Sequence, residues 1–125
     1  MYKLFGLDIS PYALKIESYL NYKKIKFKWI KNPNSKELDK LAHLPCVPLL
    51  LTDDDEVLQD STNIIEKIEL RSSNNSIYPE DSRLTFISSL LEEYSDEWMV
   101  KHLFNYRWAY NCLLYTSDAA DDLGR

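Results

Sequence analysis

The hydrophobic positions at the start of the chain follow first a strand pattern and then a helix pattern. Residues 2–7 form a short aromatic and aliphatic segment that stops at a turn, which predicts a strand. Ser10 is a favourable helix N-cap, and Pro11 suits the first helical position because the N–H that it lacks has no intrahelical partner there. Apolar residues then recur at helical spacing up to residue 22: Ala13, Ile16 and Leu20. These patterns predict a strand followed by a helix.

From residue 24 the period of the apolar positions changes from that of a helix to that of a strand. The apolar members are Ile25, Phe27 and Trp29, and the polar members are Lys24, Lys26 and Lys28. This alternation predicts a strand with one buried face. The lysines are interpreted as the solvated face of an edge strand, where positive charge discourages edge-to-edge pairing. A turn at 32–35 and a short helix over 36–43 are predicted to follow.

Residues 49–51 and 56–59 are predicted to form a β-hairpin whose tip is the acidic run 53–55. A calcium-binding loop is the alternative, but the run lacks the glycine and the distant glutamate that such a loop uses. Asp60 and Ser61 then cap a helix with apolar residues at Ile64, Ile65 and Ile68. The predicted order of elements is βαβ followed by ββα, which is an α/β fold.

The composition changes after a polar linker at 72–81. Residues 82–111 show only helical periodicity, which predicts the start of an all-α domain. One stripe of this segment carries large apolar side chains: Phe86, Leu90, Tyr94 and Trp98. We interpret them as core residues, because large rings are mostly buried. A lining for apolar substrates is the alternative.

Composition and charge exclude several classes of function. The chain has 125 residues, a formal net charge of -5 and 2 glycines. Dinucleotide-binding and P-loop sites are excluded because they need several neighbouring glycines. The negative charge argues against binding to nucleic acid, which relies on a clustered basic surface. No apolar run reaches the roughly eighteen residues of a membrane span, and no signal peptide is recognisable, so we expect a cytoplasmic protein without a membrane partner.

The cysteines and histidines form neither a disulfide framework nor a metal-ligand motif. Cys46 and Cys112 lie far apart in the sequence, and His43 and His102 do not complete a ligand spacing with them. We therefore expect no metal ion and no dithiol redox chemistry.

Three short motifs combine into a candidate site. Ser10 lies where a helix begins, and the free N–H groups and partial positive charge of a helix N-terminus favour a thiolate. Val47 and Pro48 precede a strand, and a proline there marks an exposed stretch of backbone. Asp60 and Ser61 lie at a second helix N-terminus that suits a carboxylate, while the Asp60 side chain suits an ammonium group. Each motif alone is typical of ordinary capping.

The three motifs in this order resemble a known family. Ser-Pro-Tyr-Ala-Leu-Lys-Ile, Val-Pro-Leu-Leu and Leu-Gln-Asp-Ser-Thr-Asn-Ile-Ile are similar to segments of the thioredoxin-like N-terminal domain of cytosolic glutathione transferases. The resemblance covers residues 1–71, and residues 82–111 resemble the opening of that family's helical domain. It implies a thioredoxin-like βαβ-ββα domain followed by an incomplete all-α domain.

The same resemblance implies roles for the motif residues. Ser10 would contact the glutathione sulfur, Pro48 would be a cis-proline, and Val47 would pair its backbone with the cysteinyl moiety. Asp60 and Ser61 would hold the γ-glutamyl end. Glutathione would be the substrate, its thiolate would attack an electrophile of unknown identity, and a full-length member would be a homodimer.

The sequence departs from the family pattern just before Val-Pro, where members often carry a basic residue or glutamine for the carboxylates of glutathione. This chain has Leu44-Pro45-Cys46 there. Cys46 is interpreted as a small apolar filler, with a mixed disulfide as the alternative. Tyr12 is the alternative to Ser10 as hydroxyl donor. The remaining candidates for the glycyl carboxylate are Lys31, Lys36 and Lys40.

Two hypotheses of function follow. The first is a glutathione transferase-like enzyme that transfers alkyl or aryl groups and is truncated in this chain, so that activity of the chain itself stays open. The second is a non-catalytic module that uses the same fold for protein interaction.

Residues 112–125 break the helical pattern and resemble the in-frame translation of a transposase-type sequencing adapter. We therefore expect a non-native tail, with the natural reading frame lost at about residue 111. A natural polar tail is the alternative.

Overall fold

The computed structural model describes residues 1–42, 44, 46–72 and 75–109. The tail expected at 112–125 lies outside these described residues. The chain divides into a first unit, Met1–Ile77, and a second unit that begins at Tyr78.

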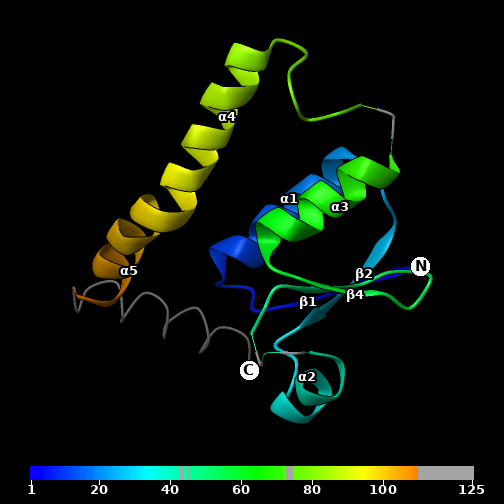
Figure 1. Cartoon of the computed structure of the whole chain (residues 1–125). Coiled ribbons are helices and arrows are strands. Elements are labelled where there is room, and N and C mark those ends of the chain that lie inside the picture. Colours follow the sequence, from blue (N-terminus) through cyan, green and yellow to red (C-terminus); the bar gives the residue numbers. More distant parts are fainter. Residues whose placement is uncertain (43, 45, 73–74, 110–125) are drawn as a thin grey trace. The chain divides into compact units, whose positions relative to one another are not determined.

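The first unit is a four-stranded sheet with helices on both faces (Figure 1). The strand order is β2-β1-β3-β4, with β1 parallel to β2 and antiparallel to β3, and β3 antiparallel to β4. The predicted βαβ-ββα order is confirmed, and it is the thioredoxin-like order that the resemblance implied. The elements are β1 (Tyr2–Gly6), α1 (Pro11–Tyr22), β2 (Phe27–Lys31), α2 (Ser35–Leu41), β3 (Leu49–Leu51), β4 (Val57–Gln59) and α3 (Ser61–Arg71).

Alternation along the strands gives the sheet two apolar faces. One face packs against α1 and α3, which lie side by side in Figure 1, and the other packs against α2. The larger cluster includes Leu4, Ile16, Leu20, Leu50 and Ile64, all with no exposed area. The smaller cluster is built on Phe5, Leu38 and Leu49. The helical positions expected to be buried in α1 and α3 are therefore confirmed.

Gly6 ends β1 on the face that α1 covers. A Cβ atom added there would lie 2.6 Å from the Cβ of Ala13, closer than such atoms approach in proteins. The absence of a side chain at this position therefore allows the first turn of α1 to pack directly on the end of β1.

The edge strand β2 begins at Phe27, later than the alternation predicted. Lys24 adopts a positive φ of 56°, which ends the preceding helical segment and redirects the chain before the strand starts. The three lysines are exposed, as expected for a solvated edge. Ile25, just before the strand, is half-buried, as are Phe27 and Trp29 on it. The two strand residues are only partly covered because an edge strand has a neighbouring strand on one side alone.

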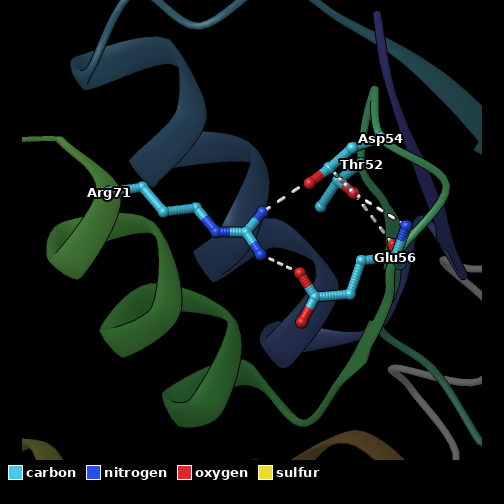
Figure 2. Close-up of polar contacts among 4 residues, drawn as sticks. All are labelled: Thr52, Asp54, Glu56 and Arg71. Atoms are coloured by element: carbon cyan, nitrogen blue, oxygen red, sulfur yellow. Dashed lines mark hydrogen bonds and ion pairs between the residues drawn. The ribbon is translucent and has the colours of Figure 1, made fainter.

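The β3–β4 hairpin is confirmed, and Thr52 closes its tip (Figure 2). The buried Thr52 hydroxyl donates to a carboxylate oxygen of Asp54 at 2.5 Å and accepts from the N–H of Glu56 at 3.0 Å. Arg71, at the end of α3, forms ion pairs with Asp54 and Glu56. The hydrogen bond from Thr52, a backbone hydrogen bond and the Arg71 charge together lower the pKa of Asp54. The acidic run is thus a hairpin tip tied to a helix end.

Among the described residues of the second unit, 82–108 form one continuous helical run after a short non-helical segment. Asp81 caps it by accepting from the N–H groups of Arg83 and Leu84 at 2.7 and 3.4 Å. The run contains α4 (Ser82–Tyr94), a π-helical turn η1 (Ser95–Met99) and α5 (Val100–Trp108). None of the helices described in either unit combines the length and the apolar character needed to cross a membrane.

The expected core stripe of this helix is exposed rather than buried. The exposed fractions are 67% for Phe86, 57% for Leu90, 48% for Tyr94 and 58% for Trp98. The prediction of a core was wrong for these residues, because the described part of the unit is a single helix, which offers them no second helical face to pack against.

Candidate functional site

Three strands bring the predicted motifs to the same end of the sheet. In the register, Phe5 of β1 pairs with Leu49 of β3, which pairs in turn with Gln59 of β4. Because β3 runs antiparallel to both neighbours, its amino end lies beside the carboxyl ends of β1 and β4. The segment before Leu49 therefore emerges at the same sheet end as the segments after Gly6 and after Gln59. These are the segments that carry Ser10, Val47, Pro48, Asp60 and Ser61.

Ser10 is half-buried and caps α1, as predicted. Its backbone N–H donates to the carbonyl of Leu7 at 2.9 Å, which closes the turn after β1. Its hydroxyl oxygen accepts from the N–H of Ala13 at 3.3 Å. A hydroxyl that accepts from the helix keeps its own proton for a further acceptor, so Ser10 can donate a hydrogen bond to an anion at the helix start.

Val47 and Pro48 join through a cis peptide bond, in agreement with the resemblance. Pro48 is buried and Val47 is half-buried against the cluster on the α2 face. Leu49 follows directly as the first residue of β3. The cis bond thus lies directly before β3, at the end of the sheet where the segments with Ser10 and Asp60 also emerge.

Asp60 and Ser61 form the start of α3. The Asp60 carboxylate accepts from the N–H groups of Thr62 and Asn63 at 2.9 and 3.2 Å. Asp60 has a φ of 72° and a ψ of 132°, a conformation that costs a residue with a side chain of the order of 1–3 kcal/mol. Ser61 is 4% exposed. The positive φ of Asp60 turns the chain abruptly from β4 into α3.

Two helix N-termini, those of α1 and α3, therefore lie at one end of the sheet. Each carries a partial positive charge and N–H groups without intrahelical acceptors. The arrangement favours anions at this end, and the exposed Asp60 carboxylate adds a place for a cation beside them. A zwitterionic ligand with a thiolate matches this distribution of charge.

The exposure of Cys46 contradicts its interpretation as a small apolar filler. The residue is an exposed free cysteine, and its Sγ lies 3.7 Å from Nε2 of Gln59. An exposed side chain fills no apolar cavity, so the filler interpretation was wrong.

The lysines proposed for a glycyl carboxylate differ in position. Lys31 pairs with Gly6 in the register and so lies at the same end of the sheet as Ser10, and its Nζ is 5.9 Å from the centre of the Trp29 ring. Lys36 and Lys40 are exposed on α2. Among the described residues, no group of three His, Cys, Asp or Glu side chains is arranged to hold a metal ion.

The sequence reasoning missed Gln59 as a residue with its own contacts. Its side chain reaches the backbone of Leu44 and Cys46, just before the cis bond. A signal was present in the sequence, because strand alternation places Gln59 on the same face as Val57, which packs in an apolar cluster. A polar side chain on a partly apolar strand face needs hydrogen-bond partners, which predicts contacts for Gln59.

Comparison with known proteins identifies the domain. The profile of the family described as glutathione S-transferase, N-terminal domain, matches residues 9–71, half of the chain. No curated protein matched the sequence.

Solved structures show the same fold. A glutathione S-transferase from Rhodospirillum rubrum F11 has a TM-score of 0.71 and 21% identity, covering 78% of this chain and 46% of its own. The Tau class glutathione S-transferase from mango, Mangifera indica, has a TM-score of 0.72 and 22% identity, covering 94% and 56%. A glutathione transferase family member from Pseudomonas fluorescens Pf-5, with bound glutathione, has a TM-score of 0.64 and 22% identity, covering 77% and 50%. The chain spans about half the length of these proteins.

Proposed function

This chain belongs to the glutathione S-transferase family through its N-terminal domain, and we propose that the first unit binds glutathione and stabilises its thiolate. The observation that carries the proposal is the convergence of Ser10, the Val47–Pro48 bond and Asp60 at one end of the sheet. A glutathione transferase family member of the same fold was solved with glutathione bound, which supports the choice of ligand.

Each segment meets a different part of the tripeptide in this proposal. The backbone of Val47 pairs with the cysteinyl moiety and so fixes the thiol near the start of α1. Ser61, at the start of α3, binds the γ-glutamyl carboxylate, and Asp60 binds its ammonium group. The Ser10 hydroxyl donates to the sulfur.

The chemical task is to hold glutathione as a thiolate at neutral pH. A free thiol of this type has a pKa of about 8.5 and is mostly protonated at pH 7. A hydrogen bond from Ser10 and the positive end of α1 stabilise the anion, and each unit of pKa depression corresponds to about 1.4 kcal/mol. The thiolate then attacks an electrophilic carbon, so that a carbon–sulfur bond forms while the leaving group departs with its electron pair. The thiol proton passes to water.

A non-catalytic binding module is the second candidate. It is favoured by the segment before the cis bond, where Leu44 and Cys46 carry no positive charge for the carboxylates of glutathione. In this case the site would retain the fold and lack the thiolate chemistry.

Calorimetric titration of the 125-residue chain with glutathione tests the proposal, followed by conjugation of 1-chloro-2,4-dinitrobenzene, in which chloride leaves. We expect binding, and a loss of conjugation rate for Ser10→Ala with little change in glutathione affinity. Binding without any effect of Ser10→Ala would favour the non-catalytic module. Absence of binding would overturn the assignment of the ligand to this chain.

A further inference from the structure

Gln59 contacts the segment before the cis bond through both ends of its carboxamide. Its Nε2 donates to the carbonyl of Leu44 at 2.8 Å, and its Oε1 accepts from the N–H of Leu44 at 3.4 Å. The same Nε2 lies 3.2 Å from the carbonyl of Cys46 and 3.7 Å from its Sγ. The side chain thus pairs with Leu44 as a further peptide group would in a sheet.

Only a carboxamide of this length makes that pairing. It donates and accepts at the same time, whereas a carboxylate at neutral pH only accepts and an aliphatic side chain does neither. Removal of the amide nitrogen would take this side-chain donor from the carbonyls of Leu44 and Cys46. The carbonyl of Leu44 also accepts from the N–H of Cys46 at 2.7 Å, so the hydrogen bond from Gln59 adds to a local one.

The same residue holds the chain on the other side of the cis bond. Gln59 is the last residue of β4 and pairs in register with Leu49, the first residue of β3. Its side chain holds residues 44 and 46, and its backbone adjoins residue 49, so the Val47–Pro48 bond lies between two stretches fixed by one residue. Asn63, in the first turn of α3, donates to the carbonyl of Gln59 at 3.0 Å and links this arrangement to the helix start.

We propose that Gln59 is a positioning residue of the glutathione site: it fixes the backbone that leads into Val47 and thereby presents the Val47 peptide groups to the cysteinyl moiety. The inference rests on the proposed function. Gln59 acts through Val47, so its loss weakens the binding of glutathione because the backbone must then be ordered when the ligand binds. The thiolate chemistry at Ser10 is left unchanged.

Gln59→Met tests the role, since methionine keeps the length of the side chain and removes both polar ends. Gln59→Glu is the second variant, which keeps the acceptor and removes the donor. Lys67→Ala, at an exposed position of α3, is the matched control. Calorimetry with glutathione is combined with amide hydrogen exchange of the free full chain at residues 44, 46 and 47, and with unfolding in urea.

We expect Gln59→Met to bind glutathione about three- to tenfold more weakly, as for the loss of one or two neutral hydrogen bonds. Gln59→Glu should lose at least as much, because its carboxylate faces the carbonyls of Leu44 and Cys46. Exchange should rise at residues 44, 46 and 47 and stay slow at Leu4 and Leu50 in the core. In the conjugation assay, KM for glutathione should rise while kcat stays within twofold. Lys67→Ala should match the parent chain in every readout.

The outcomes separate this inference from the proposed function. If the parent chain binds glutathione and both Gln59 variants bind it equally well, the positioning role is wrong while the proposed function stands. If the parent chain does not bind glutathione, both are overturned. A Gln59→Met chain that unfolds in urea like the parent, with weaker binding and faster exchange at 44–47, supports the role against a general loss of stability.

Discussion

The Tyr19 hydroxyl, on α1, donates a hydrogen bond of 2.6 Å to the Glu69 carboxylate, on α3. The Nζ of Lys23 lies 2.9 Å from the same oxygen, and the two charged side chains are 2% and 6% exposed. Lys23 also donates to the carbonyl of Asn75 at 3.0 Å, and the N–H of Ile77 donates to the other Glu69 oxygen at 3.3 Å. Glu69 therefore joins both helices to the last residues of the first unit.

Glu69→Ala should lower the free energy of unfolding of the first unit by about 3 kcal/mol, because it leaves the buried Lys23 ammonium without its carboxylate. Tyr19→Phe should cost about 1–2 kcal/mol, since it removes one hydrogen bond to a charged group. Urea unfolding followed by circular dichroism measures both. Arg71→Ala serves as the control, because its ion pairs with Asp54 and Glu56 are partly exposed and their loss should change the free energy of unfolding much less. Equal effects for Glu69→Ala and Arg71→Ala would contradict the importance of burial.

The same carboxylate makes stability depend on pH. Burial alone would raise the pKa of Glu69, but hydrogen bonds from Tyr19, Lys23 and Ile77, together with the Lys23 charge, hold it below its ordinary value of 4.5. A carboxyl whose pKa is lower in the folded state stabilises the fold above its unfolded pKa, and that contribution is lost as pH falls through the folded pKa. The free energy of unfolding should therefore decline below about pH 4.5. Urea titrations at several pH values should show a shallower decline in Glu69→Gln.

Gly6→Ala should destabilise the first unit by about 1–3 kcal/mol, as expected when an extra methyl group is forced into a packed contact. The new Cβ would lie 2.6 Å from the Cβ of Ala13, on a helix that cannot retreat without disturbing its cap at Ser10. Ala13→Gly alone should cost about 1 kcal/mol from helix propensity. The double variant Gly6→Ala/Ala13→Gly should be more stable than the sum of the two single effects allows, because the second change removes the clash. Strict additivity in urea unfolding would show that the two positions do not collide.

Local chemistry made much of the fold predictable. Ser10 and Pro11 mark the start of α1, and Asp60 marks the start of α3, because caps depend on a few neighbouring residues. Two short runs around an acidic tip likewise predicted a hairpin at 49–51 and 56–59, and the structure has its strands at Leu49–Leu51 and Val57–Gln59. These features need no knowledge of distant contacts.

The remaining features depend on residues far apart in the chain. Gln59 reaches Leu44 across fifteen positions, and Tyr19 reaches Glu69 across fifty, so neither pair leaves a periodic signal. Cys46 was interpreted by its chemical type, whereas its exposure depends on how the segment before β3 lies in the folded chain. The aromatic stripe of the second unit was interpreted as core, although burial depends on a partner surface that a single helix does not supply.

Substitution of Asp60 by glycine should affect the stability of the fold and the proposed binding of glutathione in opposite directions. At its φ of 72° a glycine would be less strained, while the carboxylate caps α3 through Thr62 and Asn63. A glycine in place of an aspartate cap costs only a few tenths of a kcal/mol, and relief of the strained backbone offsets about 1–3 kcal/mol. Asp60→Gly should therefore be at least as stable as the parent chain in urea. It should nevertheless bind glutathione at least about tenfold more weakly, because the ammonium group of the ligand loses a charged partner.

Asp60→Asn is the matched variant, since it keeps the capping oxygen and the side-chain size and removes the charge. It should retain the stability of the parent chain and share most of the loss of affinity. Calorimetry with glutathione and with a glutathione analogue that lacks the α-amino group isolates the contact, because only the intact ligand should distinguish the parent chain from Asp60→Asn. If both ligands lose the same affinity on substitution, the carboxylate does not meet the ammonium group, and the role of Asp60 is confined to the helix cap.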